Sequence, residues 1–215
     1  MKTLIYAVRH GQSVGNLQHR FLGHTEMPLT DKGREQARCA GEYLASLGVS
    51  FDAVYASSLS RAYETAVLVS GVETPIPRDA LREIHAGEWE GLLFDEIVLR
   101  YPKEAAVWNE DIGLSRPVGG ESVRALYARV SEEIFSIAKE NAGKTVLIGS
   151  HATPIRVWET FSRGLSACEA QRVPFPSNAS LSAYLVDGEK KTVLPLFYSL
   201  DSYLGDLITY LPNKL

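Results

Sequence analysis

The sequence of 215 residues predicts an α/β protein, a three-layer α/β/α sandwich around a mostly parallel central sheet. Three short apolar runs, at residues 4–8, 53–57 and 145–149, lack polar alternation, which is typical of strands buried on both faces. Helical patterns separate these runs, and that alternation favours parallel strands joined by right-handed crossovers. Two later runs flank Asp187-Gly188, a hairpin turn signal, and predict one antiparallel edge strand.

Candidate capping residues mark where the predicted helices begin and end. Thr30 is a candidate N-cap for a helix that reaches about Leu47. Ser58 or Ser60 could cap a second helix that runs to Gly71. Two further helices are expected, one over residues 121–141 and one beginning near Pro154.

Residues 94–109 interrupt the alternation of strands and helices. Pro102 divides this stretch, so two short helices are expected there. We expect a region of about 92–120 to form a small helical lid. Because no repeat, low-complexity tract or linker divides the chain, the sequence predicts a single domain over residues 1–215.

The overall charge excludes some classes of partner. With 22 basic and 26 acidic residues the formal net charge is −4, which creates no general attraction for nucleic acid or for an anionic membrane. No apolar run approaches the roughly 20 residues of a membrane span. We therefore expect neither nucleic acid nor membrane as a partner, and any anionic ligand must be held by a local cluster of cations.

The cysteines and the first apolar run predict a cytoplasmic location. Cys39 and Cys168 are far apart and belong to no metal or Cys-x-x-Cys pattern, so two buried, reduced thiols are expected. The apolar run before Arg9-His10 is too short for a signal peptide and has no small-residue cleavage site.

Polar residues follow each of the three predicted parallel strands. Arg9-His10-Gly11 follows the first, a segment that ends in Arg61 follows the second, and Ser150-His151 follows the third. Ligands of open α/β sheets bind beyond the carboxyl ends of the strands. Two histidines and two arginines at one edge are costly unless an anion lies among them. Backbone N–H groups from Gly11 onwards are also expected to bind phosphate there.

The motifs of this chain, taken in order, resemble the histidine phosphatase superfamily, also called phosphoglycerate-mutase-like. Those motifs are Arg9-His10-Gly11 with Asn16, residues 28–37, 57–66, 81–91, 119–122 and 150–156, and Asn178. The resemblance implies the phosphoglycerate-mutase-like fold and hydrolysis of a small phosphorylated substrate through a phosphohistidine. It implies that neither a metal nor another cofactor takes part.

The resemblance also implies a role for each site residue. His10 would be the nucleophile, and Arg9, Arg61 and His151 would hold the phosphoryl oxygens with the help of Asn16. Glu83 would protonate the leaving oxygen and then deprotonate the attacking water. His10 must react as neutral imidazole, and the surrounding cations are expected to lower its pKa.

Two alternatives to a phosphatase remain at this point. A cofactor-dependent phosphoglycerate mutase is the first, but residues 92–111 offer only Arg100 and Lys103 as cations, and His24 and Ala86 replace aromatic residues of the mutases that this chain resembles. A non-catalytic module that binds a phosphorylated ligand is the second. The aromatic residues of the predicted lid instead resemble the broad-specificity and α-ribazole phosphatases. The protein is expected to be a monomer or a homodimer.

Overall fold

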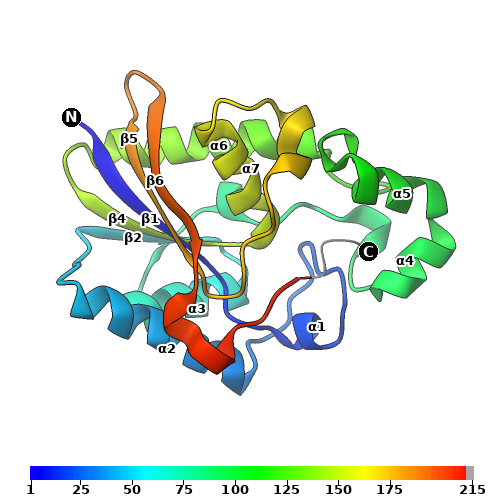
Figure 1. Ribbon diagram of the computed structural model, residues 1–215, viewed down its shortest axis with the longest axis horizontal. Coiled ribbons are helices and arrows are strands. Elements are labelled where there is room, and N and C mark those ends of the chain that lie inside the picture. Colours follow the sequence, from blue (N-terminus) through cyan, green and yellow to red (C-terminus); the bar gives the residue numbers. More distant parts are fainter. Residues whose placement is uncertain (212–215) are drawn as a thin grey trace.

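The computed structural model describes residues 1–211 and shows an α/β sandwich built on a six-stranded sheet (Figure 1). In the sheet order β3-β2-β4-β1-β5-β6, strands β1 to β4 are parallel, and β5 runs antiparallel to both of its neighbours. The strands are β1 (Thr3–Arg9), β2 (Ala53–Ala56), β3 (Ile76–Pro77), β4 (Thr145–Ser150), β5 (Leu181–Asp187) and β6 (Thr192–Leu200). The predicted fold class, with its C-terminal hairpin at the antiparallel edge, is confirmed. The last four residues of the predicted domain, 212–215, lie outside the described part of the chain.

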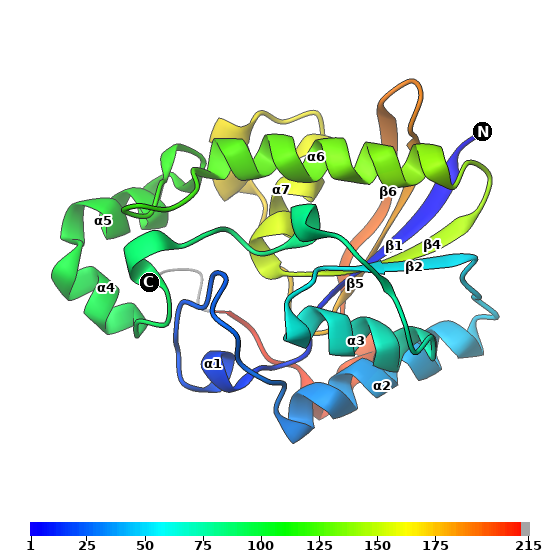
Figure 2. The same cartoon turned by 180° about the vertical axis from the view of Figure 1, so that it is seen from behind.

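Helices cover both faces of the sheet, as the two opposite views show (Figures 1 and 2). Side chains of β1 alternate between two apolar cores, since Ile5 and Ala7 join one core and Val8 joins the other. The first core packs under α6 and α7, and the second packs under α2 and α3. These helices are α2 (Asp31–Ser46), α3 (Ser60–Ser70), α6 (Val123–Glu140) and α7 (Ala152–Ser162).

The predicted N-cap of α2 is confirmed and that of α3 is wrong. The Thr30 hydroxyl accepts a hydrogen bond from the backbone N–H of Gly33. At α3 the capping position falls on Leu59, which has no side-chain acceptor. The hydroxyl of Ser58 instead bonds Asp79 and Arg82, and the carboxylate of Glu26 accepts from the backbone N–H of Ser60. The N–H group at the start of α3 is therefore bonded by a residue that is distant in sequence, where a neighbouring serine was predicted as the cap.

Helix α7 begins two residues before Pro154, and His151 is its N-cap. The strand β4 therefore passes into the helix through His151 alone, which places that side chain at the carboxyl edge of the sheet. The one-turn helix α1 (Val14–Leu17) and the two-residue strand β3 are among the short elements that were not predicted. Both are too short to show a hydrophobic period.

Two short helices follow residues 81–91, as predicted, and lie at the end of the molecule that is distant from the N-terminus (Figure 1). They are α4 (Phe94–Arg100) and α5 (Pro102–Glu110). Ile97 and Trp108 are buried, and the Trp108 ring packs edge-on against Trp89 and Phe21. That these helices act as a lid stays a prediction.

No helix within residues 1–211 is long and apolar enough to cross a membrane. The two free cysteines, Cys39 and Cys168, are half-buried, so the prediction that both are buried is wrong. Cys39 lies beside the buried stripe of α2 and not on it, and the Arg124 guanidinium contacts the Cys168 sulfur at 3.3 Å.

Candidate active site

Three neighbouring strands bring the predicted site residues to one edge of the sheet. β4 lies between β2 and β1, with Arg9 opposite Ser150 in the register. The backbone N–H of His10 donates to the Ser150 carbonyl at 3.0 Å, and that of Ser57 donates to the Gly149 carbonyl at 2.8 Å. The segments that leave the strands are therefore held side by side by continued strand pairing, which gives the convergence that the sequence predicted.

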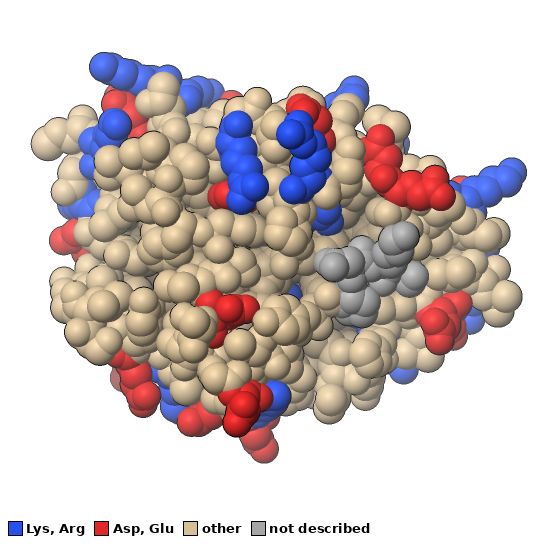
Figure 3. All heavy atoms as spheres, viewed as in Figure 1, with Lys and Arg blue, Asp and Glu red and all other residues tan. Residues whose placement is uncertain are grey.

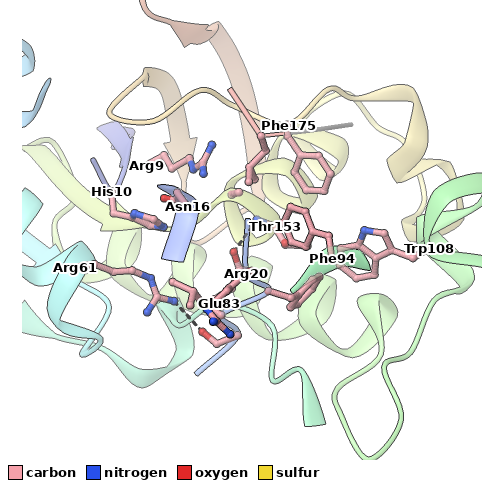
Figure 4. A pocket seen from close by; sticks show the side chains of 15 residues that line it. Arg9, His10, Asn16, Arg20, Arg61, Glu83, Phe94, Trp108, Thr153 and Phe175 are labelled. Atoms are coloured by element: carbon pink, nitrogen blue, oxygen red, sulfur yellow. Dashed lines mark hydrogen bonds between the residues drawn. The ribbon is translucent and has the colours of Figure 1, made fainter. Parts of the chain in front are cut away.

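A pocket of about 580 Å³, including its open mouth, lies at this edge. Figure 4 shows Arg9, His10, Asn16 and Arg61 on one side of it and the rings of Phe94, Trp108 and Phe175 on the other. The wall thus has a cationic part and an aromatic part. The lining residues are Arg9, His10, Asn16, Arg20, Phe21, Leu22, Gly23, Arg61, Glu83, Phe94, Trp108, Ala152, Thr153, Phe175 and Leu211.

His10 is buried and held in one tautomer. Its Nδ1–H donates to the Gly11 carbonyl at 2.7 Å, so Nε2 keeps its lone pair. Burial lowers the pKa of His10 well below its ordinary value, and the charges of Arg61 and Arg9 lower it further. The expected lowering of the pKa by nearby cations is present, although burial is the larger cause. The side chain is therefore a neutral imidazole with a free nucleophilic nitrogen at neutral pH.

Arg9 and Arg61 are both buried, with part of each guanidinium left for a ligand. Arg9 Nη1 donates to the Pro176 carbonyl at 2.6 Å, and Arg61 donates to two carbonyls of the loop at residues 23–25. Among the described residues, neither Nε atom has a hydrogen-bond partner. Burial lowers the pKa of Arg9 to about 10 and also lowers that of Arg61, while the Glu83 carboxylate opposes the shift in both. Both arginines thus line the pocket, and each retains a buried Nε without a partner, a cost that an anion bound to those donors would remove.

His151 is fully buried beside His10 and does not line the pocket wall. The two imidazoles meet edge-on, with ring centroids 5.2 Å apart. Nε2 of His151 lies 2.8 Å from the hydroxyl of Ser57, and Nδ1 has no partner within residues 1–211. The Ser57 oxygen accepts from the Leu59 N–H, so its own hydrogen can be donated to Nε2. In that tautomer Nδ1–H is a free donor.

Asn16 points its amide nitrogen at the pocket because its oxygen is already bonded. Asn16 Oδ1 accepts from the backbone N–H of Ser13 at 3.1 Å and from Asn178 Nδ2 at 3.2 Å. The Ser13 hydroxyl in turn caps α1 through the Asn16 N–H. The Ser13 hydroxyl lies 3.1 Å from the same oxygen, so three donors fix the amide orientation and NH₂ is the group that Asn16 can offer to a ligand.

Glu83 lines the same pocket, and its charge acts on both arginines. One carboxylate oxygen accepts from the backbone N–H of Ile84 at 2.8 Å, and the other accepts from that of Thr153 at 3.3 Å. The Glu83 carbonyl accepts from Arg129 and from His24 Nε2. Side chain and backbone are therefore both anchored, with the carboxylate at the pocket.

The hydrogen bonding of the Gly11 N–H does not support its predicted role in phosphate binding, which stays a prediction. That N–H donates to the Thr65 hydroxyl at 3.1 Å, and Gly11 does not line the pocket. The N–H groups of the next two residues are also bonded within the protein, to Gln36 and Asn16. Gly11 instead provides the carbonyl that orients His10 and permits close packing, since a Cβ there would lie 2.1 Å from the Gly33 carbonyl oxygen.

Sequence reasoning missed part of the pocket wall. Arg20 lines it and is held by the Gly91 carbonyl at 2.7 Å. Leu211 and Phe175 also line it, although they belong to segments far along the chain. These residues lie in loops without periodicity, so no sequence signal marked them. Among residues 1–211, no three His, Cys, Asp or Glu side chains come together as a metal site would require.

Comparison with known proteins identifies relatives over most of the chain. Residues 5–197 match the family model described as the histidine phosphatase superfamily (branch 1). A 2,3-bisphosphoglycerate-dependent phosphoglycerate mutase 2 of Gloeobacter violaceus is 37% identical over 161 residues, which are 71% of this chain and 72% of the relative. Phosphoserine phosphatase 1 of Hydrogenobacter thermophilus is 28% identical over 201 residues, 93% of each chain.

A solved structure has the same fold. Bacillus stearothermophilus YhfR superimposes with a TM-score of 0.87 at 30% identity, over 94% of this chain and 99% of that chain. Relatives with both mutase and phosphatase names are therefore similar to this chain, and the names alone do not distinguish the two reactions.

Proposed function

The chain belongs to the histidine phosphatase superfamily, and on that basis we propose that it is a phosphomonoester hydrolase that acts through a phosphohistidine on His10. The single observation that supports the proposal most strongly is the His10 imidazole, neutral, with Nε2 free, between two buried arginines. A small phosphorylated metabolite is the substrate class that this site fits.

The proposed reaction has two steps. Nε2 of His10 attacks phosphorus, the bond from phosphorus to the ester oxygen breaks, and Glu83 gives its proton to the leaving oxygen. Water then attacks the phosphohistidine, Glu83 takes a proton from it, and phosphate leaves. In both steps Arg9, Arg61 and Asn16, which line the pocket, stabilise the charge on the phosphoryl oxygens. His151 is buried beside His10 and outside the pocket wall, so its assigned role requires the bound phosphoryl group to reach its Nδ1–H.

Glu83→Gln is expected to slow phosphoenzyme formation much more for an alkyl phosphate than for nitrophenyl phosphate. General acid help is worth roughly 10²–10⁴-fold for a poor leaving group, and a nitrophenolate needs it far less. Pre-steady-state bursts measure this step apart from dephosphorylation, which also uses Glu83. Equal slowing of both bursts would show that Glu83 is not the acid.

The charges around the pocket support hydrolysis over mutase chemistry. Of the cations within residues 1–211, those that line the pocket are Arg9, Arg20 and Arg61. Neither Arg100, which pairs with Glu96 on the surface, nor Lys103 reaches the wall. A phosphoglycerate carries a carboxylate and, in the bisphosphate, a second phosphate, and the wall opposite His10 offers these groups mainly aromatic carbon.

A direct assay separates the candidate functions. Phosphomonoester hydrolysis is expected to exceed the interconversion of 2- and 3-phosphoglycerate when both are measured on one preparation. Faster interconversion, dependent on bisphosphoglycerate, would support the mutase, which the 37% identical relative favours. Saturable phosphate binding without released phosphate would support a non-catalytic binding module.

The aromatic wall supports a leaving group with an apolar or aromatic body, as in the broad-specificity and α-ribazole phosphatases that the segment resembles. Trp108 packs edge-on against Phe21 with centroids 5.0 Å apart, and Phe94 packs against the same ring. Such rings bind an apolar group by removing its surface from water. Phe94→Ala is therefore expected to raise KM for naphthyl phosphate more than for glycerol phosphate, and an equal change in both would contradict this specificity.

We expect activity without a metal ion, because two arginines at the phosphoryl group can stabilise the charge that develops in the transition state. Activity should survive treatment with EDTA followed by dialysis. Loss of activity that only Mg²⁺ or Zn²⁺ restores would contradict the expectation.

A further inference from the structure

Glu90 joins two segments that carry site residues, although it does not line the pocket itself. Its carboxylate accepts four hydrogen bonds: Oε1 from the backbone N–H groups of His24 and Ala86, both at 2.9 Å, and Oε2 from the N–H of Thr25 at 2.8 Å and the Thr25 hydroxyl at 2.7 Å. A carboxylate has about four lone-pair positions, so this one is fully occupied. Glu90 is therefore not available to exchange a proton with a substrate.

The loop that Glu90 holds is the loop that holds Arg61. Arg61 Nη2 donates to the Gly23 carbonyl at 2.8 Å, and Nη1 donates to the Thr25 carbonyl at 2.9 Å. The acceptors that orient the buried guanidinium thus belong to the residues on either side of the His24 N–H that Glu90 binds. A shift of this loop moves both acceptors together and turns the guanidinium relative to His10.

The other segment that Glu90 holds carries Glu83. Ala86 is three residues beyond Glu83, and the imidazole of His24 donates to the Glu83 carbonyl at 2.9 Å. Bonds to Glu90 and to Glu83 therefore tie the loop at residues 23–25 to the segment of the proposed acid. Arg61 and Glu83 both line the pocket and are drawn close together in Figure 4, and the Glu83 charge acts on Arg61.

Gly23 permits this close approach. Its φ of +49° is a left-handed conformation, and a Cβ there would lie 2.3 Å from Glu90 Oε1 and 2.7 Å from the Ala86 side chain. Without a side chain at this position, the carboxylate can reach the N–H groups beyond it.

We propose that Glu90 is a positioning residue, which fixes the loop at residues 23–25 so that Arg61 points at the phosphoryl group. The inference rests on the proposed function, since it assigns Arg61 to that reaction. Glu90 acts through Arg61 and neither contacts the substrate nor transfers a proton.

Glu90→Gln tests the proposal because a carboxamide keeps the size of the side chain and turns one acceptor into a donor. With its oxygen on His24 and Ala86, the NH₂ group faces the N–H of Thr25, and the loop must move away. We expect kcat to fall roughly 10–100-fold with KM changed less than about threefold, since a small misplacement removes transition-state contacts. Glu88→Gln is the matched control, because Glu88 is exposed and bonds the Tyr101 hydroxyl.

A double-mutant cycle separates positioning of Arg61 from a general structural role. Glu90→Gln should slow an Arg61→Ala protein by less than about threefold, because the group that Glu90 positions is absent. Equal slowing in both backgrounds would overturn the proposal. Within the Glu90→Gln protein, bursts with an alkyl phosphate and with nitrophenyl phosphate should slow alike, and a loss confined to the alkyl phosphate would identify Glu90 as the acid instead.

Thr25→Val provides the same test if Glu90→Gln does not fold. It removes one of the four bonds without leaving a backbone N–H unpaired, and we expect kcat to fall about two- to fivefold, again only when Arg61 is present. If the wild-type protein hydrolyses its substrate and kcat is unchanged in both variants, this inference is overturned and the proposed function stands. A wild-type protein without turnover would overturn the proposed function and this inference with it.

Discussion

His10→Ala is expected to lower kcat by roughly 10⁴-fold or more, because it removes the free imidazole nitrogen that we propose as the nucleophile. The remaining wall still binds phosphate, so KM or phosphate affinity should change far less than kcat. The exposed His85 provides the control, and His85→Ala should keep kcat within about twofold of the wild-type value. Steady-state phosphate release measures both. A His10→Ala protein that keeps a tenth of the wild-type rate would contradict a nucleophilic role.

The pH dependence of the wild-type enzyme follows from the environment of His10. Burial first, and then the charges of Arg61 and Arg9, lower the pKa of its imidazole below the ordinary value of 6.5. The neutral form that attacks therefore persists as the pH falls through 6.5. The acidic limb of kcat/KM, which reports the free enzyme, should lie below that pH. An acidic limb at pH 6.5 or above, if His10 is the titrating group, would mean that the pocket does not lower the pKa of the imidazole.

Arg61→Ala is the second large effect, an expected fall of roughly 10²–10³-fold in kcat/KM, or about 3–4 kcal/mol of transition-state stabilisation. The guanidinium is buried, oriented by two carbonyls, and retains an unpartnered Nε in the described structure. Lysine carries its three N–H donors on a single nitrogen and lacks the planar fork that reaches both carbonyls and an anion, so Arg61→Lys should recover little of the loss.

One control variant and one stability measurement make the Arg61 result specific. Arg34 forms an ion pair with Glu64 and does not line the pocket, so Arg34→Ala should leave kcat/KM within about twofold. Removal of Arg61 also leaves two carbonyls without their donor, which is expected to lower the free energy of unfolding by about 1–3 kcal/mol. Activity should therefore be measured well below the melting temperature of the variant. A kcat/KM that falls less than tenfold there would contradict the proposed role.

We expect the charges on the surface outside the pocket to have little effect on the rates of these variants. Figure 3 shows that Lys and Arg gather along the upper edge of one face while much of its middle carries no charged side chains. The formal net charge of −4 likewise gives no general attraction for an anion. The effects of His10 and Arg61 variants should thus depend on the local cluster and change little between about 0.05 and 0.2 M salt.

The sheet and the convergence of the site were predictable from sequence because both depend on local signals. Buried strands appear as apolar runs, and the residues just beyond 4–8, 53–57 and 145–149 must meet if those strands are parallel neighbours. The cap of α3 was not predictable, since Glu26 reaches Ser60 from another loop. The bonding of the Gly11 N–H was also hidden, because its acceptor, Thr65, lies on α3, 54 positions along the chain.

The rest of the pocket depends on tertiary contacts that leave no periodic pattern. Glu83 was found only through the motif around it, since its anchoring to the N–H of Thr153 joins segments 70 positions apart. Arg20, Phe175 and Leu211 reach the wall from loops and from the far end of the chain. Glu90 was visible in sequence only as a neighbour of Glu83, and its four bonds to two segments appear first in the structure.

The most direct test of the proposed mechanism is to find the residue that carries the phosphoryl group during turnover. Wild-type protein quenched within the burst phase, with phosphate-labelled substrate, should retain label that is stable in base and released in acid, the behaviour of a phosphohistidine. Peptide mapping under basic conditions should place that label on His10. Label on a serine, an aspartate or a cysteine, or turnover with no trapped label at any quench time, would contradict the account.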